Sequence, residues 1–309
     1  SACLIAATHT HSGGPTTDCF DSAPDAVYQA EVVGQIASAI AQAHRAMRPA
    51  LASTASAAAP GVAFNRRFFM RDGSQRTHPG KMNPDIDSPV GPEDPTVTVV
   101  GFRVPEETVP FGCVVHFACH ATHMNGLAYS ADYPRWIVDT LRAVYGPAFG
   151  VVFVNGAAGD VTQVDNRSAR PYEFGSYWCR RTGQSVGAAA LQALSCADYY
   201  SDASIDLGSA RIRLPIREAS SAELREARRL ARNGADDIET IYARELLCVE
   251  ELRGLCPFYR AELQALRIAD AAFWSAPGEL FQAFAQRVGK SSRFPHTCCV
   301  SLANGYAGY

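Results

Sequence analysis

Two hydrophobic periodicities alternate along this chain, one typical of strands and one typical of helices. Short runs rich in Val, Phe and Cys predict strands, at 2–7, 62–69, 97–104, 113–119, 150–154, 204–214 and 297–302. Apolar residues three or four apart predict helices, one between the possible caps Ser22 or Asp25 and Pro49, and others at 134–144, 182–194 and 280–288. The mixture favours the α/β class.

We therefore expect one domain over residues 1–309, with a mixed β-sheet core flanked by helices. Residues 219–270 are rich in Glu, Arg, Ala and Leu, and Glu226 lies three residues before Arg229, so this region is predicted to be a helical insertion that forms a lid or subdomain. Residues 72–95 contain five prolines and little periodicity, and are expected to be an extended loop.

Composition removes several classes of function. The 309 residues are 47% hydrophobic, and 28 basic against 31 acidic residues give a net charge of -3, which predicts a soluble globular protein without a nucleic-acid partner. No apolar run approaches the roughly 20 residues of a transmembrane segment. Ten cysteines without a C-x-x-C pair are too few for a disulfide scaffold and are expected to be reduced thiols. The apolar start without Met and the end at Tyr309 suggest a piece cut from a longer protein at both ends.

Candidate chemistry gathers where three predicted strands run into polar, glycine-bearing loops. His9 and His11 follow the first strand, His120 and His123 follow the strand that carries His116, and Asp160 and Thr162 follow the third. On an extended backbone His9 and His11 share a face, as do His116 and His120. Imidazole is a common metal ligand, so a zinc-type site with a histidine from each pair is the first hypothesis; ordinary buried or surface histidines are the alternative.

Six short motifs then occur in an order that resembles the neutral/alkaline (non-lysosomal) ceramidase family. They are Ala7-Thr-His-Thr-His-Ser-Gly13, Asn65-Arg66, Phe117-Ala-Cys-His120, Asn155-x-x-x-Gly-Asp-Val-Thr162, Ala276-Pro-Gly-Glu279 and Asn304-x-Tyr-x-x-Tyr309. Together they span almost the whole chain. The family's C-terminal immunoglobulin-like domain has no counterpart in these residues, and residues 219–270 carry no motif that matches the family.

The resemblance implies a zinc amidase that cleaves the N-acyl bond of ceramide or a related N-acyl lipid to a fatty acid and an amine such as sphingosine. The implied metal ligands are His9, His120, Glu279 and Tyr309. It also implies that His11 shuttles a proton or binds the oxyanion and that Arg66 supplies positive charge. Thr162 occupies the place of a serine in the family.

Several alternatives remain at this stage. Arg67 and Tyr306 neighbour the matched positions, Arg66 is otherwise a surface charge, and Glu279 is otherwise a carboxylate at a helix N-terminus. Thr162 is followed by Gln163 instead of proline, and its methyl group crowds a covalent attack, which favours attack by zinc-activated water. Two further functions stay open, a zinc hydrolase of other N-acyl amines, peptides or esters and a non-catalytic binding relative. The resemblance favours a secreted or periplasmic location, and the sequence indicates no oligomeric state.

Overall fold

The fold is built around two four-stranded sheets that share one connection pattern. The computed structural model describes residues 3–18, 20–232, 234 and 237–308. The strand orders are β1-β6-β7-β8 and β10-β11-β12-β13. In each sheet the first three strands are antiparallel and the last two run parallel. The predicted α/β class with mixed sheets is confirmed.

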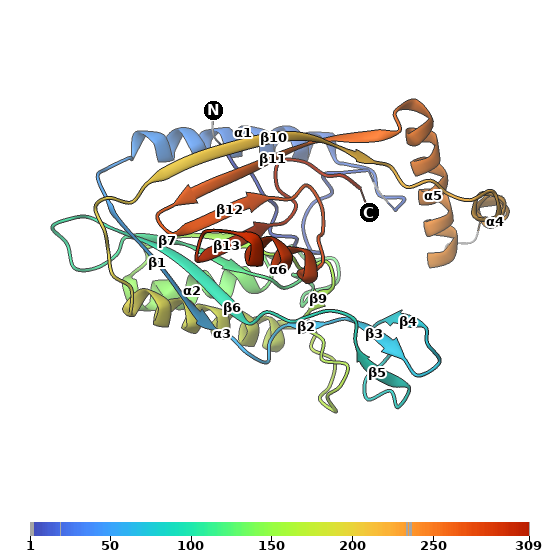
Figure 1. Cartoon of the computed structure of the whole chain (residues 1–309), viewed down its shortest axis with the longest axis horizontal. Coiled ribbons are helices and arrows are strands. Elements are labelled where there is room, and N and C mark those ends of the chain that lie inside the picture. Colours follow the sequence, from blue (N-terminus) through green and yellow to red (C-terminus); the bar gives the residue numbers. More distant parts are fainter. Residues whose placement is uncertain (1–2, 19, 233, 235–236, 309) are drawn as a thin grey trace.

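Two helices cover the outer face of the first sheet (Figure 1). The strands are β1 (Leu51–Ala58), β6 (Thr96–Arg103), β7 (Gly112–Phe117) and β8 (Gly150–Asn155), and the helices are α2 (Tyr133–Tyr145) and α3 (Ser176–Ser195). The helices approach closely because α3 is rich in small residues: a Cβ added at Gly183 would lie 2.3 Å from the carbonyl oxygen of Tyr133. Val115 and Phe117 of β7 face these helices and are fully buried.

The inner face of the first sheet packs against the second sheet. The second sheet contains β10 (Ile205–Pro215), β11 (Phe258–Ile268), β12 (Ala271–Ser275) and β13 (His296–Val300). Val100 and Val114 of the first sheet meet Phe273 and Val300 of the second in one buried cluster. The alternation along β7 therefore sends Val114 and Val115 into two different cores, as the period of two requires.

The first helix, α1 (Ala26–Arg45), lies on the side of the second sheet away from α2 and α3 (Figure 1). Of its two possible caps the structure uses Asp25, whose carboxylate accepts hydrogen bonds from the backbone of Val27 and Tyr28. The predicted helix is confirmed, although none of its side chains is fully buried and Val27 and Val33 are exposed.

Smaller elements surround one end of the sheets. They are β2 (Phe64–Asn65) paired with β9 (Val161–Thr162), the three-stranded sheet of β3 (Arg67–Met70), β4 (Gln75–Thr77) and β5 (Ile86–Pro89), the helical hairpin of α4 (Ser221–Arg232) and α5 (Ile238–Leu255), and α6 (Gln282–Ser291). None of the helices within the described part of the chain has both the length and the apolar character that a bilayer crossing requires.

Four sequence-based expectations need correction. The helical insertion is real but ends at Leu255, and residues 258–268 form β11. The expected loop 72–95 contains β4 and β5. Of the expected strand 2–7, the described residues 3–7 form one isolated bridge, between Ala6 and Ala303. The sequence did not predict β1 or β12.

Candidate metal centre

The loop that carries His9 and His11 is held on both sides by isolated bridges to the segments that follow β13 and β7. Before His9, Ala6 bridges Ala303; after it, Thr10 bridges Ala121 and the backbone N–H of His11 donates to the Ala121 carbonyl at 3.1 Å. His9 itself has a φ of 66°, in the left-handed region that non-glycine residues rarely occupy. Such a conformation persists where its surroundings determine it, and these bridges supply that constraint.

His120 follows β7 and its ring is oriented by backbone carbonyls. Its Nδ1 lies 2.5 Å from the Ala158 carbonyl oxygen and 3.1 Å from that of Val161. Carbonyl oxygens only accept, so Nδ1 carries the proton and Nε2 of the neutral ring presents a lone pair. Burial lowers the pKa of His120, which favours this neutral form. A ring held in this way is typical of a metal-ligating histidine.

Glu279 completes a set of three donor atoms. Its Oε2 lies 3.2 Å from Nε2 of His9 and 3.2 Å from Nε2 of His120. The oxygen is buried, and no group in the described part of the chain donates a hydrogen bond to it.

These separations fit a small cation. Donors about 2.1 Å from a tetrahedral zinc ion lie about 3.4 Å from one another, close to the distances observed. A lone pair on His120 Nε2 that faces a carboxylate oxygen is unfavourable unless a cation lies between them. His9, His120 and Glu279 also line a cavity of about 10 Å³, a volume of the scale of a single ion or water. The three side chains therefore fit a zinc site.

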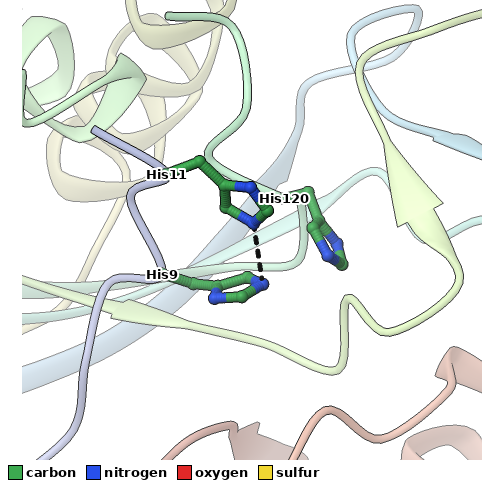
Figure 2. Close-up of side chains that lie close together, drawn as sticks. All are labelled: His9, His11 and His120. Atoms are coloured by element: carbon green, nitrogen blue, oxygen red, sulfur yellow. Dashed lines mark hydrogen bonds between the residues drawn. The ribbon is translucent and has the colours of Figure 1, made fainter. Parts of the chain in front are cut away.

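His11 is the third histidine of the cluster and lies beside this set. Figure 2 shows the rings of His9, His11 and His120 converging, and Nε2 of His11 lies 3.4 Å from Nε2 of His9. Ligand atoms of the three histidines all lie within 4.8 Å of one another. Burial, with His9 and His120 nearby, lowers the pKa of His11 to about 4. The ring is therefore neutral near pH 7 and can accept a proton.

The turn 158–161 ties the remaining site segments together. The Arg66 guanidinium donates to the Gly159 carbonyl at 2.6 Å, and the Gly159 N–H donates to the Leu280 carbonyl. The buried Asp160 carboxylate accepts from the Asn65 side chain and from the backbone N–H of Gln282, each at 2.8 Å. It thus caps α6 in place of Phe281, which gives no side-chain cap. One turn orients His120, Arg66 and the segment that follows Glu279.

Other predicted residues lie elsewhere. Thr162 is buried, donates to Gln163 at 2.8 Å and lines neither cavity that borders Glu279. His116 contacts the Cys299 carbonyl, and His123 is buried between Asp132 and Thr182. Tyr309 lies outside the described residues. The roles predicted for Thr162 and Tyr309 stay predictions.

A larger cavity of about 580 Å³ adjoins the centre at Glu279. Its walls come from four parts of the chain, namely Arg66, Arg67 and Thr77, then Gly159, then Tyr242 of α5, then Glu279, Phe281 and Gly308. Tyr242 packs edge-on against Phe20, and Arg244 of α5 pairs with Asp21, so the helical hairpin is fastened beside the cavity. No sequence pattern points to Tyr242 as a cavity residue, because its position depends on this tertiary contact.

The fold is similar to that of two solved ceramidase structures. One is the neutral ceramidase from Pseudomonas aeruginosa, with a TM-score of 0.65 and 18% identity over 99% of this chain and 54% of that chain. The other is a ceramidase complexed with C2, with a TM-score of 0.67 and 16% identity over 99% of this chain and 56% of that chain. This chain spans about half the length of either structure.

No family model matches the sequence, and no curated protein matches it. The resemblance that the six motifs indicated is thus confirmed at the level of the fold.

Proposed function

We propose that this chain is a zinc-dependent amide hydrolase that cleaves the N-acyl bond of ceramide or a related N-acyl lipid. The observation that carries the proposal is the buried Glu279 Oε2, which accepts no hydrogen bond from any described residue and lies 3.2 Å from ring nitrogens of both His9 and His120. The fold shared with ceramidases and a cavity of about 580 Å³ beside Glu279 support an amide substrate of lipid size.

His9, His120 and Glu279 would hold the metal, with Tyr309 as the further ligand that the motifs predict. When bound, zinc would supply Lewis acidity that lowers the pKa of water toward about 7 and polarises the scissile carbonyl.

His11 moves the proton in this proposal. Its Nε2, which lies 3.4 Å from Nε2 of His9, accepts a proton as the oxygen of the attacking water bonds to the carbonyl carbon. The same nitrogen returns that proton to the amine as the C–N bond breaks, so a carboxylic acid and a free amine leave. Hydrolysis needs no other reactant.

Arg66 and Thr162 have different places in the reaction. The Arg66 guanidinium, fixed by the Gly159 carbonyl, offers positive charge toward the oxygen that becomes negative in the transition state. Thr162 is buried and its hydroxyl donates to Gln163, so we assign the attack to water and not to this side chain.

The test combines metal analysis with hydrolysis of a panel of N-acyl amines, an N-acyl peptide and an ester. We expect about one zinc per chain and amide hydrolysis that a chelator abolishes and added zinc restores. His9→Ala, His120→Ala and Glu279→Gln should each lose zinc and activity. His44→Ala, on the exposed last turn of α1, is the matched control and should retain both.

Three results would contradict the proposal. Zinc retained at full occupancy by all three ligand variants would remove the assigned centre. Hydrolysis of the ester or the peptide alone would replace the amide substrate with one of those. Binding of N-acyl amines without turnover at any zinc loading would make this chain a binding protein.

A further inference from the structure

Two neighbouring arginines line the larger cavity without a carboxylate partner. Both side chains are half-buried, and among the described residues neither guanidinium lies within 4.0 Å of a carboxylate oxygen. Arg66 donates to the Gly159 carbonyl at 2.6 Å, and Arg67 donates to Oε1 of Gln75 at 2.8 Å, so both known partners are neutral. Partly buried cations without counter-charge beside a cavity point to an anionic ligand.

Arg67 is held ready for such a ligand. It begins β3 opposite Thr77 of β4, and its backbone N–H donates to the Asn65 side chain at 2.9 Å. Its guanidinium lies 4.8 Å from the centre of the Phe281 ring, and Gln75 holds one amino group. The contact with the Phe281 ring and the hydrogen bond to Gln75 orient the guanidinium plane of Arg67. Most of its N–H donors remain available to a ligand in the cavity.

The charge of the cavity favours the same ligand. Among the described residues that line it, Arg66 and Arg67 are the cations and Glu279 is the carboxylate. In the proposed function Glu279 binds zinc, so its negative charge is already offset, and the two arginines are the remaining charges among the described residues that line the cavity. A planar guanidinium binds a carboxylate through two parallel hydrogen bonds, which gives orientation as well as attraction.

We propose that the substrate is an N-acyl amine that carries a carboxylate, and that Arg67 is the specificity-determining residue that binds this group. The inference rests on the proposed amide hydrolysis and narrows its substrate class. Ceramide carries no carboxylate, so the proposal predicts that an amide with a carboxylate is a better substrate than ceramide. Arg66, which donates a hydrogen bond to the Gly159 carbonyl, instead directs its positive charge toward the oxygen of the scissile carbonyl.

The test compares amides of equal chain length with the zinc-loaded full chain. N-decanoylglycine carries the carboxylate on the amine part, N-succinyl-decylamine carries it on the acyl part, and N-decanoylethanolamine is neutral. We expect kcat/KM for at least one acidic amide to exceed that for the neutral amide by about tenfold or more. Which acidic amide is preferred identifies the side on which Arg67 meets the substrate.

Substitution of Arg67 should remove this preference. Arg67→Gln should lower kcat/KM for the preferred acidic amide by about tenfold to a hundredfold, mainly through KM, and change the neutral amide by less than about threefold. Arg67→Lys keeps the charge without the planar fork and should fall between. Arg76→Gln is the control, because Arg76 is exposed on β4 and pairs with Asp72 outside the cavity.

The outcomes separate this inference from the proposed function. Equal or faster hydrolysis of the neutral amide by the wild type, or an equal loss on all amides in Arg67→Gln, overturns the assignment of Arg67. Should Arg67→Gln not fold, salt decides: raising NaCl from about 50 mM to about 500 mM must weaken wild-type turnover of the acidic amide selectively. The remaining outcome is that no amide is turned over, while calorimetry shows binding of N-decanoylglycine that Arg67→Gln abolishes. This result would reject the proposed amide hydrolysis and support the assignment of Arg67 as a carboxylate-binding residue.

Discussion

Gly159 is the position where one added methyl group should disturb the metal centre most directly. A Cβ at residue 159 would lie 2.2 Å from the carbonyl oxygen of Glu279, 2.9 Å from its carbonyl carbon and 3.0 Å from the carbonyl oxygen of Leu280. All three atoms belong to the backbone, so no side-chain rotation relieves the overlap. Non-bonded carbon and oxygen atoms need roughly 3.4 Å, so the two segments must separate by about 1 Å.

The size of the effect follows from that displacement. The segment that would move carries Glu279, and the turn that would move orients His120 and holds Arg66. A misplacement of about 1 Å in a catalytic constellation costs on the order of a hundredfold in rate, or about 2.7 kcal/mol. Overpacking of a buried backbone contact adds about 1–3 kcal/mol of lost stability. Gly159→Ala should therefore fold less stably, bind zinc more weakly and turn over slowly.

Three measurements check this reasoning. Zinc affinity is measured by competition with a chromophoric chelator, turnover with an N-acyl amine, and the free energy of unfolding with urea. Gly34→Ala is the matched control, because a Cβ at this position in α1 meets nothing within 4 Å. It should gain about 0.5–1 kcal/mol of stability and leave zinc binding unchanged. Wild-type zinc affinity and turnover in Gly159→Ala would refute the role given to the 158–161 turn.

Three further perturbations test other parts of the site. Asp160→Asn should weaken zinc binding about 10–100-fold, as measured by chelator competition. The double variant Asn65→Asp/Asp160→Asn should restore zinc binding in the same assay. In it the amide of residue 160 donates to the carboxylate of residue 65, and the backbone N–H of Gln282 keeps an acceptor oxygen on residue 160. Burial holds the pKa of His11 near 4, below its ordinary 6.5, so the unfolded metal-free chain binds more protons between these values. Urea unfolding should show stability falling as pH drops from about 6.5 to about 4, and less steeply in His11→Gln. Tyr242→Ala should raise KM about threefold to tenfold by removing a cavity wall, with zinc affinity unchanged in the same chelator assay.

The residues of the candidate metal centre can be singled out from the sequence because they lie in local motifs. His9 and His120 each follow an apolar segment, and Glu279 follows a Pro-Gly turn, so their chemistry shows in short stretches of chain. The structure brings all three together across separations of 111 and 159 residues. No hydrophobic periodicity predicts that these three residues lie together. The prediction comes from the order of the motifs, which resembles that of the ceramidase family.

The rest of the site depends on tertiary contacts that leave no local pattern. The sequence does not predict β1, because its Ala, Ser and Thr residues lack a clear apolar alternation, and the strand forms by pairing with β6 along its whole length. β11 was included in a helical region because charged residues continue through it, yet pairing with β10 over eleven residues decides its conformation. Arg67 was noticed as the neighbour of a motif residue, but only the fold shows that it lines the cavity.

The candidate metal ligands and the residues that line the larger cavity lie on different parts of the fold. In the candidate metal centre, isolated bridges hold the backbone on either side of His9, and the left-handed conformation of His9, worth about 1–3 kcal/mol of strain, indicates that this backbone is firmly determined. The larger cavity shares Glu279 and Gly159 with that centre, but further walls come from peripheral additions, the small β3–β4–β5 sheet with Arg67 and the α4–α5 hairpin with Tyr242. Substitutions in these additions can change the shape and charge of the cavity without moving the ligands. We therefore expect a substitution at Arg67 to change which substrate is preferred while the candidate metal centre stays in place.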